Sequence, residues 1–379
     1  MKTLGLYLHI PFCKSKCRYC DFCSFPHPKA TAVEQYVDSL CADLKGRAEA
    51  CSSHTVDTVY FGGGTPTLLS ANDLGRLLDT VFRYYRVSKT AEITAECNPA
   101  TVHAEALRQM RRAGFNRLSI GLQSAHENEL KALGRLHSFE DFLRTWEDAR
   151  AADFHNLSAD VMFGIPHQTR DSFRSTLERL LALKPEHLSA YALTVEEGTA
   201  FGRIGEQNLC LPDEDTVENM YFDMVSQLEA AGLWQYEISN FAAKGYASRH
   251  NLKYWRQEEY LGLGPAAHSD FNGVRFGNGR SLEAYLAGSD LVEERGCPDE
   301  RERLNEFIML RMRLKEGICL REMADRFGED AADRFCESMK PYVAAGFAEL
   351  AEGSCRFTVR GMLVSLSILS EVTDFASDE

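Results

Sequence analysis

Six short apolar segments, each followed by a helical pattern, fill the first half of this 379-residue chain and most strongly restrict its fold. Period-2 alternation or continuous apolar character marks them as strands, and the segments between them repeat apolar residues at helical spacing. The predicted strands span residues 3–10, 55–61, 91–97, 116–123, 157–163 and 187–194. Strands joined through helices form parallel sheets with right-handed crossovers. The pattern predicts an α/β fold, a partial (β/α)6 barrel of the TIM type, whose active site lies on the loops that follow the strands.

Three parts of the chain are expected. Residues 1–195 form the barrel core, residues 196–298 a less regular extension of the barrel, and residues 299–379 a C-terminal, α-rich domain. Helices followed by a small hairpin over 347–359 make this last domain similar to a winged helix. Its 17 acidic and 11 basic residues give a net charge of −6. A DNA-reading role is therefore not expected, and a packing role is favoured.

The charge and hydropathy of the whole chain limit the kinds of partner that it is expected to bind. With 42 Lys and Arg against 56 Asp and Glu, the net charge is −14. Nucleic-acid binding needs basic patches that displace counterions, so no nucleic-acid partner is expected. No apolar run approaches the ~20 residues of a membrane span, and the N-terminal segment lacks a signal-peptide cleavage site. We expect a cytoplasmic protein without a membrane span, with peripheral membrane contact left open.

Three cysteines follow the first predicted strand in the order Cys13-Lys-Ser-Lys-Cys17-Arg-Tyr-Cys20. Cysteine thiolates hold iron–sulfur clusters, and the gaps between them indicate the type of cluster. Three thiolates on a four-iron cluster leave one iron open to another ligand. Cys23 offers an alternative, a four-thiolate zinc site, but structural zinc sites usually pair two C-x2-C halves across a longer loop. The spacing predicts a [4Fe–4S] cluster without Cys23, and it resembles that of radical S-adenosylmethionine (SAM) enzymes.

Polar residues on the later strands point to the same end of the barrel. Glu96, Gln123 and Asp160 lie on or interrupt apolar strands, where they would line the interior. Each alone could be a satisfied core residue, but three near the mouth that holds the cysteines favour a binding site. The run Gly62-Gly-Gly-Thr-Pro66 follows a strand, and its backbone can approach a ligand closely. In this setting it would bind the amino group of SAM.

A second group of residues, His250, Tyr254 and Trp255, allows two interpretations. Their spacing suits a helix packed in an ordinary core, which is the interpretation that spacing alone favours. They could instead face a flat aromatic ligand, because histidine ligates iron and aromatic rings stack on a macrocycle.

Taken together, these motifs resemble the oxygen-independent coproporphyrinogen III oxidase superfamily and, within it, the HemW-type haem chaperones. The resemblance runs nearly end to end and is carried by Tyr7-Leu-His-Ile-Pro-Phe-Cys13, Gly62-Gly-Gly-Thr-Pro-Thr67, Arg117-Leu-Ser-Ile-Gly-Leu-Gln123, Asp160-Val-Met-Phe-Gly-Ile-Pro166 and His250-Asn-Leu-Lys-Tyr-Trp255.

The resemblance implies a [4Fe–4S] cluster held by Cys13, Cys17 and Cys20, with SAM on the fourth iron. It implies SAM contacts at Tyr7, Tyr19, Gly63, Gly64, Thr65, Glu96, Gln123, Arg135 and Asp160. Arg135 would bind a carboxylate; otherwise it is an exposed helix cation. The motif of His250, Tyr254 and Trp255 fits the chaperone group and would serve haem.

Two departures from the oxidases favour the chaperone group. The oxidase pattern has a further cysteine two residues after the third, where this chain has Phe22. Oxidases also carry a longer segment ahead of the Tyr7 position, where only six residues stand here. The resemblance therefore implies a haem chaperone that passes haem to acceptor proteins, with no catalytic residue assigned. The alternatives are radical decarboxylation of coproporphyrinogen III in porphyrin biosynthesis and a radical SAM methyltransferase.

Overall fold

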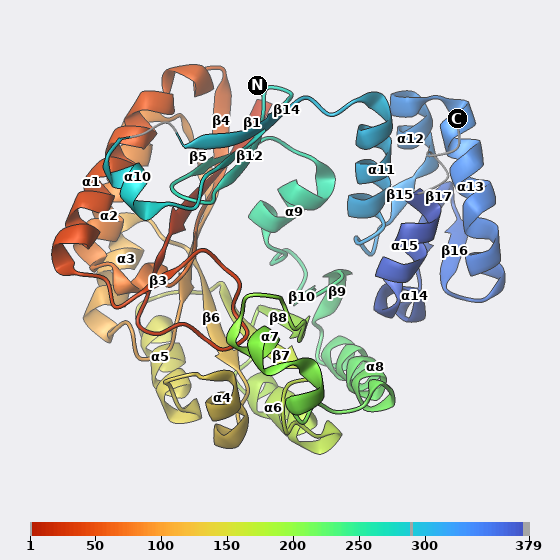
Figure 1. The fold of residues 1–379 in the computed structure, drawn as a ribbon, viewed down its shortest axis with the longest axis horizontal. Coiled ribbons are helices and arrows are strands. Elements are labelled where there is room, and N and C mark those ends of the chain that lie inside the picture. Colours follow the sequence, from red (N-terminus) through yellow and green to blue (C-terminus); the bar gives the residue numbers. More distant parts are fainter. Residues whose placement is uncertain (1, 289–290, 374–379) are drawn as a thin grey trace. The chain divides into compact units, whose positions relative to one another are not determined.

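The computed structural model describes residues 2–288 and 291–373. The chain divides into two compact units (Figure 1). We call them the barrel unit (Met1–Met220 with Glu259–Gly296) and the C-terminal unit (Tyr221–Glu258 with Cys297–Glu379).

Six parallel strands form the centre of the barrel unit, in the order β1-β4-β5-β6-β7-β8. They are β1 (Lys2–Ile10), β4 (His54–Gly63), β5 (Val87–Cys97), β6 (Arg117–Gln123), β7 (Leu157–Phe163) and β8 (His187–Ala192). Each overlaps one of the strands predicted from the sequence. The order of strands follows the order in the chain, so each connection joins strands that are neighbours in the sheet. The predicted α/β class, with a large and mostly parallel sheet, is confirmed.

Amphipathic helices connect these strands and lie along the outside of the sheet (Figure 1). They are α1 (Ala30–Arg47), α2 (Ala71–Tyr84), α3 (Ala104–Ala113), α4 (Glu127–Leu133), α5 (Phe139–Ala151) and α6 (Arg170–Leu181). In α2, the Ser70 side chain caps the helix by accepting from the Asp73 N–H, and the buried stripe begins at Leu74. This capping and spacing explain why the segment is helical.

The edge of the sheet beside β1 was not predicted as strands. β11 (Tyr260–Leu263) pairs parallel with β1, and β12 (His268–Phe271), β13 (Val274–Asn278) and β14 (Val292–Gly296) continue antiparallel. A Cβ on Gly262 would lie 2.3 Å from the His268 carbonyl oxygen, so the close approach of these strands requires glycine there. Shorter elements complete this unit: β2 (Phe12–Cys13), β3 (Phe25–Pro26), α7 (Ala200–Ile204), α10 (Leu282–Leu286) and the 3-10 turns Glu49–Cys51, Pro66–Leu68 and Glu206–Asn208.

The C-terminal unit is α-rich. It begins within α8 (Glu214–Ala230), at Tyr221. This helix leads into the hairpin β9 (Trp234–Glu237) and β10 (Asn240–Ala242), and then into α9 (Arg249–Arg256). The later part contains α11 (Glu300–Arg311), β15 (Ile318–Cys319), α12 (Leu320–Phe327), α13 (Glu329–Ala344), β16 (Ala348–Ala351), β17 (Ser354–Phe357), α14 (Val359–Leu363) and α15 (Ser365–Thr373). Three short strands pair in the order β15-β17-β16. The helices and hairpin expected after residue 299 are present.

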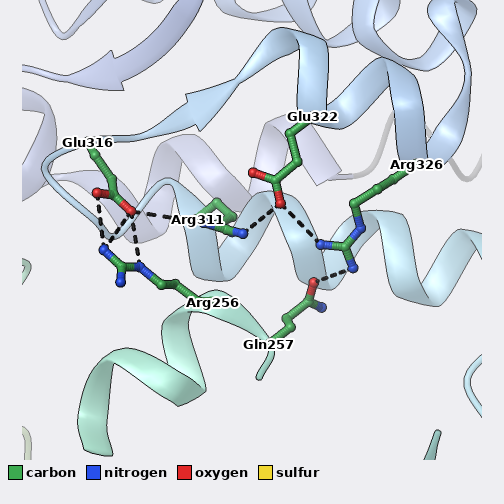
Figure 2. Close-up of polar contacts among 6 residues, drawn as sticks. All are labelled: Arg256, Gln257, Arg311, Glu316, Glu322 and Arg326. Atoms are coloured by element: carbon green, nitrogen blue, oxygen red, sulfur yellow. Dashed lines mark hydrogen bonds and ion pairs between the residues drawn. The ribbon is translucent and has the colours of Figure 1, made fainter. Parts of the chain in front are cut away.

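A chain of polar contacts ties α9 to the later helices (Figure 2). Arg256 of α9 donates from Nε and NH2 to Glu316 Oε1 at 3.2 and 3.1 Å, and from NH2 to Oε2 at 3.2 Å. Glu322 of α12 accepts from Arg311 at 2.7 Å and lies 3.5 Å from Arg326. Arg326 in turn donates to the Gln257 side chain at 3.3 Å. Helix α9 is therefore anchored within the C-terminal unit.

Across residues 2–288 and 291–373, no helix combines the length and apolar character needed to cross a membrane.

Candidate functional site

The cysteine loop, by which we mean residues 11–27, lies directly after β1. Its ends are held together by pairing of β2 with β3, and His27 N–H donates to the Cys13 carbonyl at 3.1 Å. In its middle, Arg18 N–H donates to the Leu133 carbonyl at 3.0 Å, and Phe201 N–H donates to the Arg18 carbonyl at 2.9 Å. These backbone contacts place the loop at the carboxyl end of the parallel strands, where an α/β barrel carries its active site.

The three cysteines of the predicted cluster lie on this loop, with Cys13 buried and Cys17 and Cys20 half-buried. Burial is the main reason that the pKa of Cys20 is raised to about 11, and the charges of Cys17 and Cys13 raise it further. Three thiols that influence one another electrostatically are a soft donor set that suits iron and sulfide. Within the described part of the chain, no three His, Cys, Asp or Glu side chains form a site for a single metal ion. The observation that supports an iron–sulfur cluster at this loop is therefore the set of three cysteine sulfurs.

A hydrogen-bond chain links two of these thiols through side chains from other elements. Thr65 donates from Oγ1 to Cys13 Sγ at 3.7 Å, and Asn98 donates to Thr65 Oγ1 at 2.8 Å. Arg135 donates to Asn98 Oδ1, and its NH1 lies 3.5 Å from Cys17 Sγ. Hydrogen-bond donors directed at sulfur commonly orient thiol ligands around a metal centre, so these contacts suit a ligating role for both cysteines.

Arg135 is not an ordinary exposed helix cation. It comes after α4, which ends at Leu133 and is capped by Gly134 with a φ of +76°. Its NH2 also donates to the Gly121 carbonyl at 2.8 Å. A cleft of about 60 Å³ lies among residues 14–17 of the cysteine loop, residues 98–101 and residues 134–137. The guanidinium thus sits beside the cysteine loop, where it can bind a carboxylate.

The glycine run at the end of β4 packs tightly against β1 and the start of the cysteine loop. Gly63 has a φ of +108°, and a Cβ there would lie 2.6 Å from His9 Cε1. A Cβ on Gly64 would lie 2.6 Å from the Phe12 carbonyl oxygen. Only glycine allows the backbone to pass at these distances.

Two half-buried carboxylates, Glu96 on β5 and Asp160 on β7, lie on the two strands that flank β6. Glu96 accepts from Tyr60 Oη at 3.0 Å and from Gly63 N–H at 3.1 Å. Burial raises the pKa of Glu96 to about 7, and repulsion from Asp160 adds to the effect. Asp160 accepts from Ser119 Oγ at 2.9 Å, and burial raises its pKa as well. Carboxylates whose pKa is raised in this way are typical of binding sites.

Arg117 is part of the same interior and was missed from the sequence. It is 1% exposed, and its positive charge lowers the pKa of both Glu96 and Asp160. It lies at the start of β6 with the same parity as Ser119, which bonds Asp160. That parity is the signal that could have found it.

The remaining predicted SAM contacts also belong to the barrel unit. Tyr7 Oη lies 3.0 Å from His9 Nδ1, and Tyr19 packs against the apolar cluster that contains Leu133 and Phe201. Burial is the largest cause of a raised pKa at Tyr19. Gln123 ends β6 with a φ of +72° and is 8% exposed.

Cys23 and the predicted haem residues have other surroundings. The Cys23 thiol donates to the Arg280 carbonyl at 3.5 Å.

His250 is 1% exposed, and its Nε2 lies 2.8 Å from Tyr254 Oη. Trp255 is half-buried, with the Arg313 guanidinium 5.8 Å from its ring centroid. These haem-motif residues lie on α9 of the C-terminal unit, whereas the predicted cluster and SAM residues all lie in the barrel unit.

Comparison with known proteins places this geometry in context. The Radical SAM superfamily model matches residues 7–180, and the HemN C-terminal domain model matches residues 299–364. Heme chaperone HemW of Bacillus subtilis is 34% identical over 94% of this chain and 96% of its own length. Heme chaperone HemW of Escherichia coli is 38% identical over 83% of this chain and 84% of its own length. The structure of E. coli coproporphyrinogen III oxidase (HemN) has the same fold, with a TM-score of 0.86, 22% identity, and coverage of 99% of this chain and 91% of that one.

Proposed function

Because this chain belongs to the HemW family of radical SAM proteins, we propose that it is a haem chaperone that binds haem and passes it to acceptor proteins. The observation that carries the proposal is the similarity to B. subtilis heme chaperone HemW over 94% of the chain. The family also implies a [4Fe–4S] cluster and SAM.

In the proposed arrangement, Cys13, Cys17 and Cys20 hold the cluster. When bound, the cluster supplies a redox-active iron site with one iron open to SAM. Thr65 and Arg135 donate hydrogen bonds to Cys13 and Cys17, which supports this assignment. The backbone of the Gly62–Gly64 run receives the SAM amino group, and Arg135 its carboxylate. Tyr7, Tyr19, Thr65, Glu96, Gln123 and Asp160 complete the SAM contacts.

Haem is proposed to bind at His250, Tyr254 and Trp255. An anchored helix with two aromatic rings and an imidazole offers the stacking surface and the iron ligand that a porphyrin needs. The His250 Nε2 atom already bonds Tyr254 Oη at 2.8 Å, so ligation through this nitrogen requires the phenol to move aside.

A second candidate function is the radical decarboxylation of coproporphyrinogen III, because this chain and HemN share the same fold. Against it, the position of the further cysteine in the oxidase pattern is Phe22, a residue 66% exposed. Nothing beyond the Radical SAM superfamily match favours the methyltransferase alternative.

A paired assay tests the proposal. The anaerobically reconstituted protein is titrated with haem, followed by absorbance, and is separately incubated with coproporphyrinogen III, SAM and a reductant. We expect saturable haem binding and no protoporphyrinogen. Turnover to protoporphyrinogen would assign the protein to the oxidases, and a protein that binds no haem would not be a haem chaperone.

A further inference from the structure

Arg313 is a half-buried cation without a matching anion. It follows α11 in the C-terminal unit, and its Nε is buried without a hydrogen-bond partner. Over the residues that the structure describes, its guanidinium forms no ion pair with a carboxylate. Burying a charge is costly unless it is paired, so such a side chain indicates a site for an anionic group.

Other arginines of the same unit are paired with carboxylates. Arg256 bonds Glu316, and Arg311 and Arg326 both contact Glu322 (Figure 2). Arg313 therefore stands apart from its neighbours although the chain carries a net charge of −14.

Glu237 is the carboxyl group that acts electrostatically on Arg313, and its negative charge balances the guanidinium charge only partly. Glu237 is fully buried, and its Oε1 accepts from Ser239 N–H at 3.2 Å, while its Oε2 has no partner among the described residues. Burial raises the pKa of Glu237 to about 7, so near neutral pH this carboxyl is only partly ionised. Burial also lowers the pKa of Arg313, and the Glu237 charge offsets only part of that effect.

The position of Arg313 indicates which anion it would bind. Its guanidinium carbon lies 5.8 Å from the centroid of the half-buried Trp255 ring. If the guanidinium binds a carboxylate, a planar aromatic group attached to that carboxylate would lie close to the Trp255 indole. A porphyrin combines a flat aromatic surface with carboxylates on flexible propionate arms, and arginine binds carboxylates in a bidentate manner.

We infer that Arg313 binds a propionate of the porphyrin while the macrocycle contacts Trp255, an assignment that rests on the proposed haem-binding function. Arg313 is thereby a ligand-binding residue of the C-terminal domain, and it selects porphyrins that carry free carboxylates.

The test compares haem with haem dimethyl ester, whose propionates carry no charge. Dissociation constants for both are measured by absorbance titration on the full-length, reconstituted protein and on its Arg313→Gln, Arg313→Lys and Arg301→Gln variants. Arg301 is an exposed arginine of the preceding helix and serves as the matched control. Thermal midpoints are recorded for every variant.

The wild type and Arg301→Gln should bind haem about tenfold more tightly than the ester, as expected for loss of a charge-assisted hydrogen bond. Arg313→Gln should bind haem and ester equally, at the affinity that the wild type has for the ester. Arg313→Lys should keep part of the preference.

Two results would overturn the inference while leaving the proposed function in place. One is a wild type that binds haem and its ester equally, a measurement that needs no variant to fold. The other is an Arg313→Gln variant with the full wild-type preference for haem. A wild type that binds neither compound would refute the proposed function, and the inference with it.

Discussion

At the scale of single residues, Gly63 and Gly46 differ in the space around the α-carbon. Gly63 has positive φ and would place a Cβ 2.6 Å from His9 Cε1, whereas Gly46, on α1, has nothing within 4 Å. Gly63→Ala should lose roughly 2 kcal/mol or more of unfolding free energy from strain and overlap, and should weaken SAM binding. Gly46→Ala should gain about 0.5–1 kcal/mol, as an alanine in a helix does.

Urea unfolding and SAM titration measure both effects. A Gly63→Ala variant with wild-type stability and SAM affinity would contradict the tight packing of Gly63 against His9 of β1.

Glu237 gives stability a dependence on pH. Its folded-state pKa is about 7 against an ordinary value of 4.5, because it is buried. Between these values the folded state keeps a proton that the unfolded state has released, so this stabilisation is complete below about 4.5 and is lost as the pH rises through 7. Glu237→Gln cannot ionise, and the loss of stability between pH 5 and pH 8 should shrink by roughly 1–3 kcal/mol.

Urea unfolding at the two pH values decides this prediction. An equal pH dependence in wild type and variant would mean that Glu237 titrates normally in the folded protein.

At the scale of elements, the anchoring of α9 depends on its ion pairs. Removing the carboxylate in Glu316→Gln leaves Arg256 with a weaker acceptor, and should cost about 0.5–1 kcal/mol at low salt and less at 1 M salt. Glu337→Gln, which removes an exposed pair with Lys340 on α13, is the matched control and should cost less. Hydrogen exchange of the α9 amides should accelerate only in Glu316→Gln. Unchanged exchange there would mean that packing alone holds the helix.

The elements themselves divide into those that the sequence predicts and those that it does not. Strand–helix alternation predicts β1 and β4–β8 because buried parallel strands read as clear apolar runs. The sequence predicts no strands over residues 260–278, because the glycines that allow close packing of β11 and β12 weaken the apolar pattern. Likewise, residues 234–242 form the tight hairpin of β9 and β10, which local periodicity cannot resolve into two strands.

At the scale of the whole molecule, the proposed ligands belong to different compact units. The predicted cluster and SAM residues lie in the barrel unit, and the haem-motif residues lie in the C-terminal unit. Cys13→Ser should therefore abolish the iron–sulfur absorbance while the affinity for haem changes by less than about threefold, a difference below 1 kcal/mol. Loss of haem binding together with the cluster would instead mean that the two ligands share one site or are strongly coupled.

The candidate site shows the same limit of sequence reasoning at this scale. The alternation of side chains along each strand predicts that Glu96 and Asp160 face the same interior, because every second side chain of a strand lies on the same face. Asn98 and Arg313 carry no such signal, because their contacts join segments far apart in the chain. Three-dimensional packing, which one sequence does not specify locally, brings those segments together.

The most direct test of the account is the metal content and electron paramagnetic resonance spectrum of the anaerobically reconstituted, reduced protein, recorded with and without SAM. A cluster held by Cys13, Cys17 and Cys20 predicts about four irons per chain and a [4Fe–4S]⁺ signal that shifts when SAM binds the open iron. Zinc without iron, or a four-iron signal that SAM leaves unchanged, would contradict it.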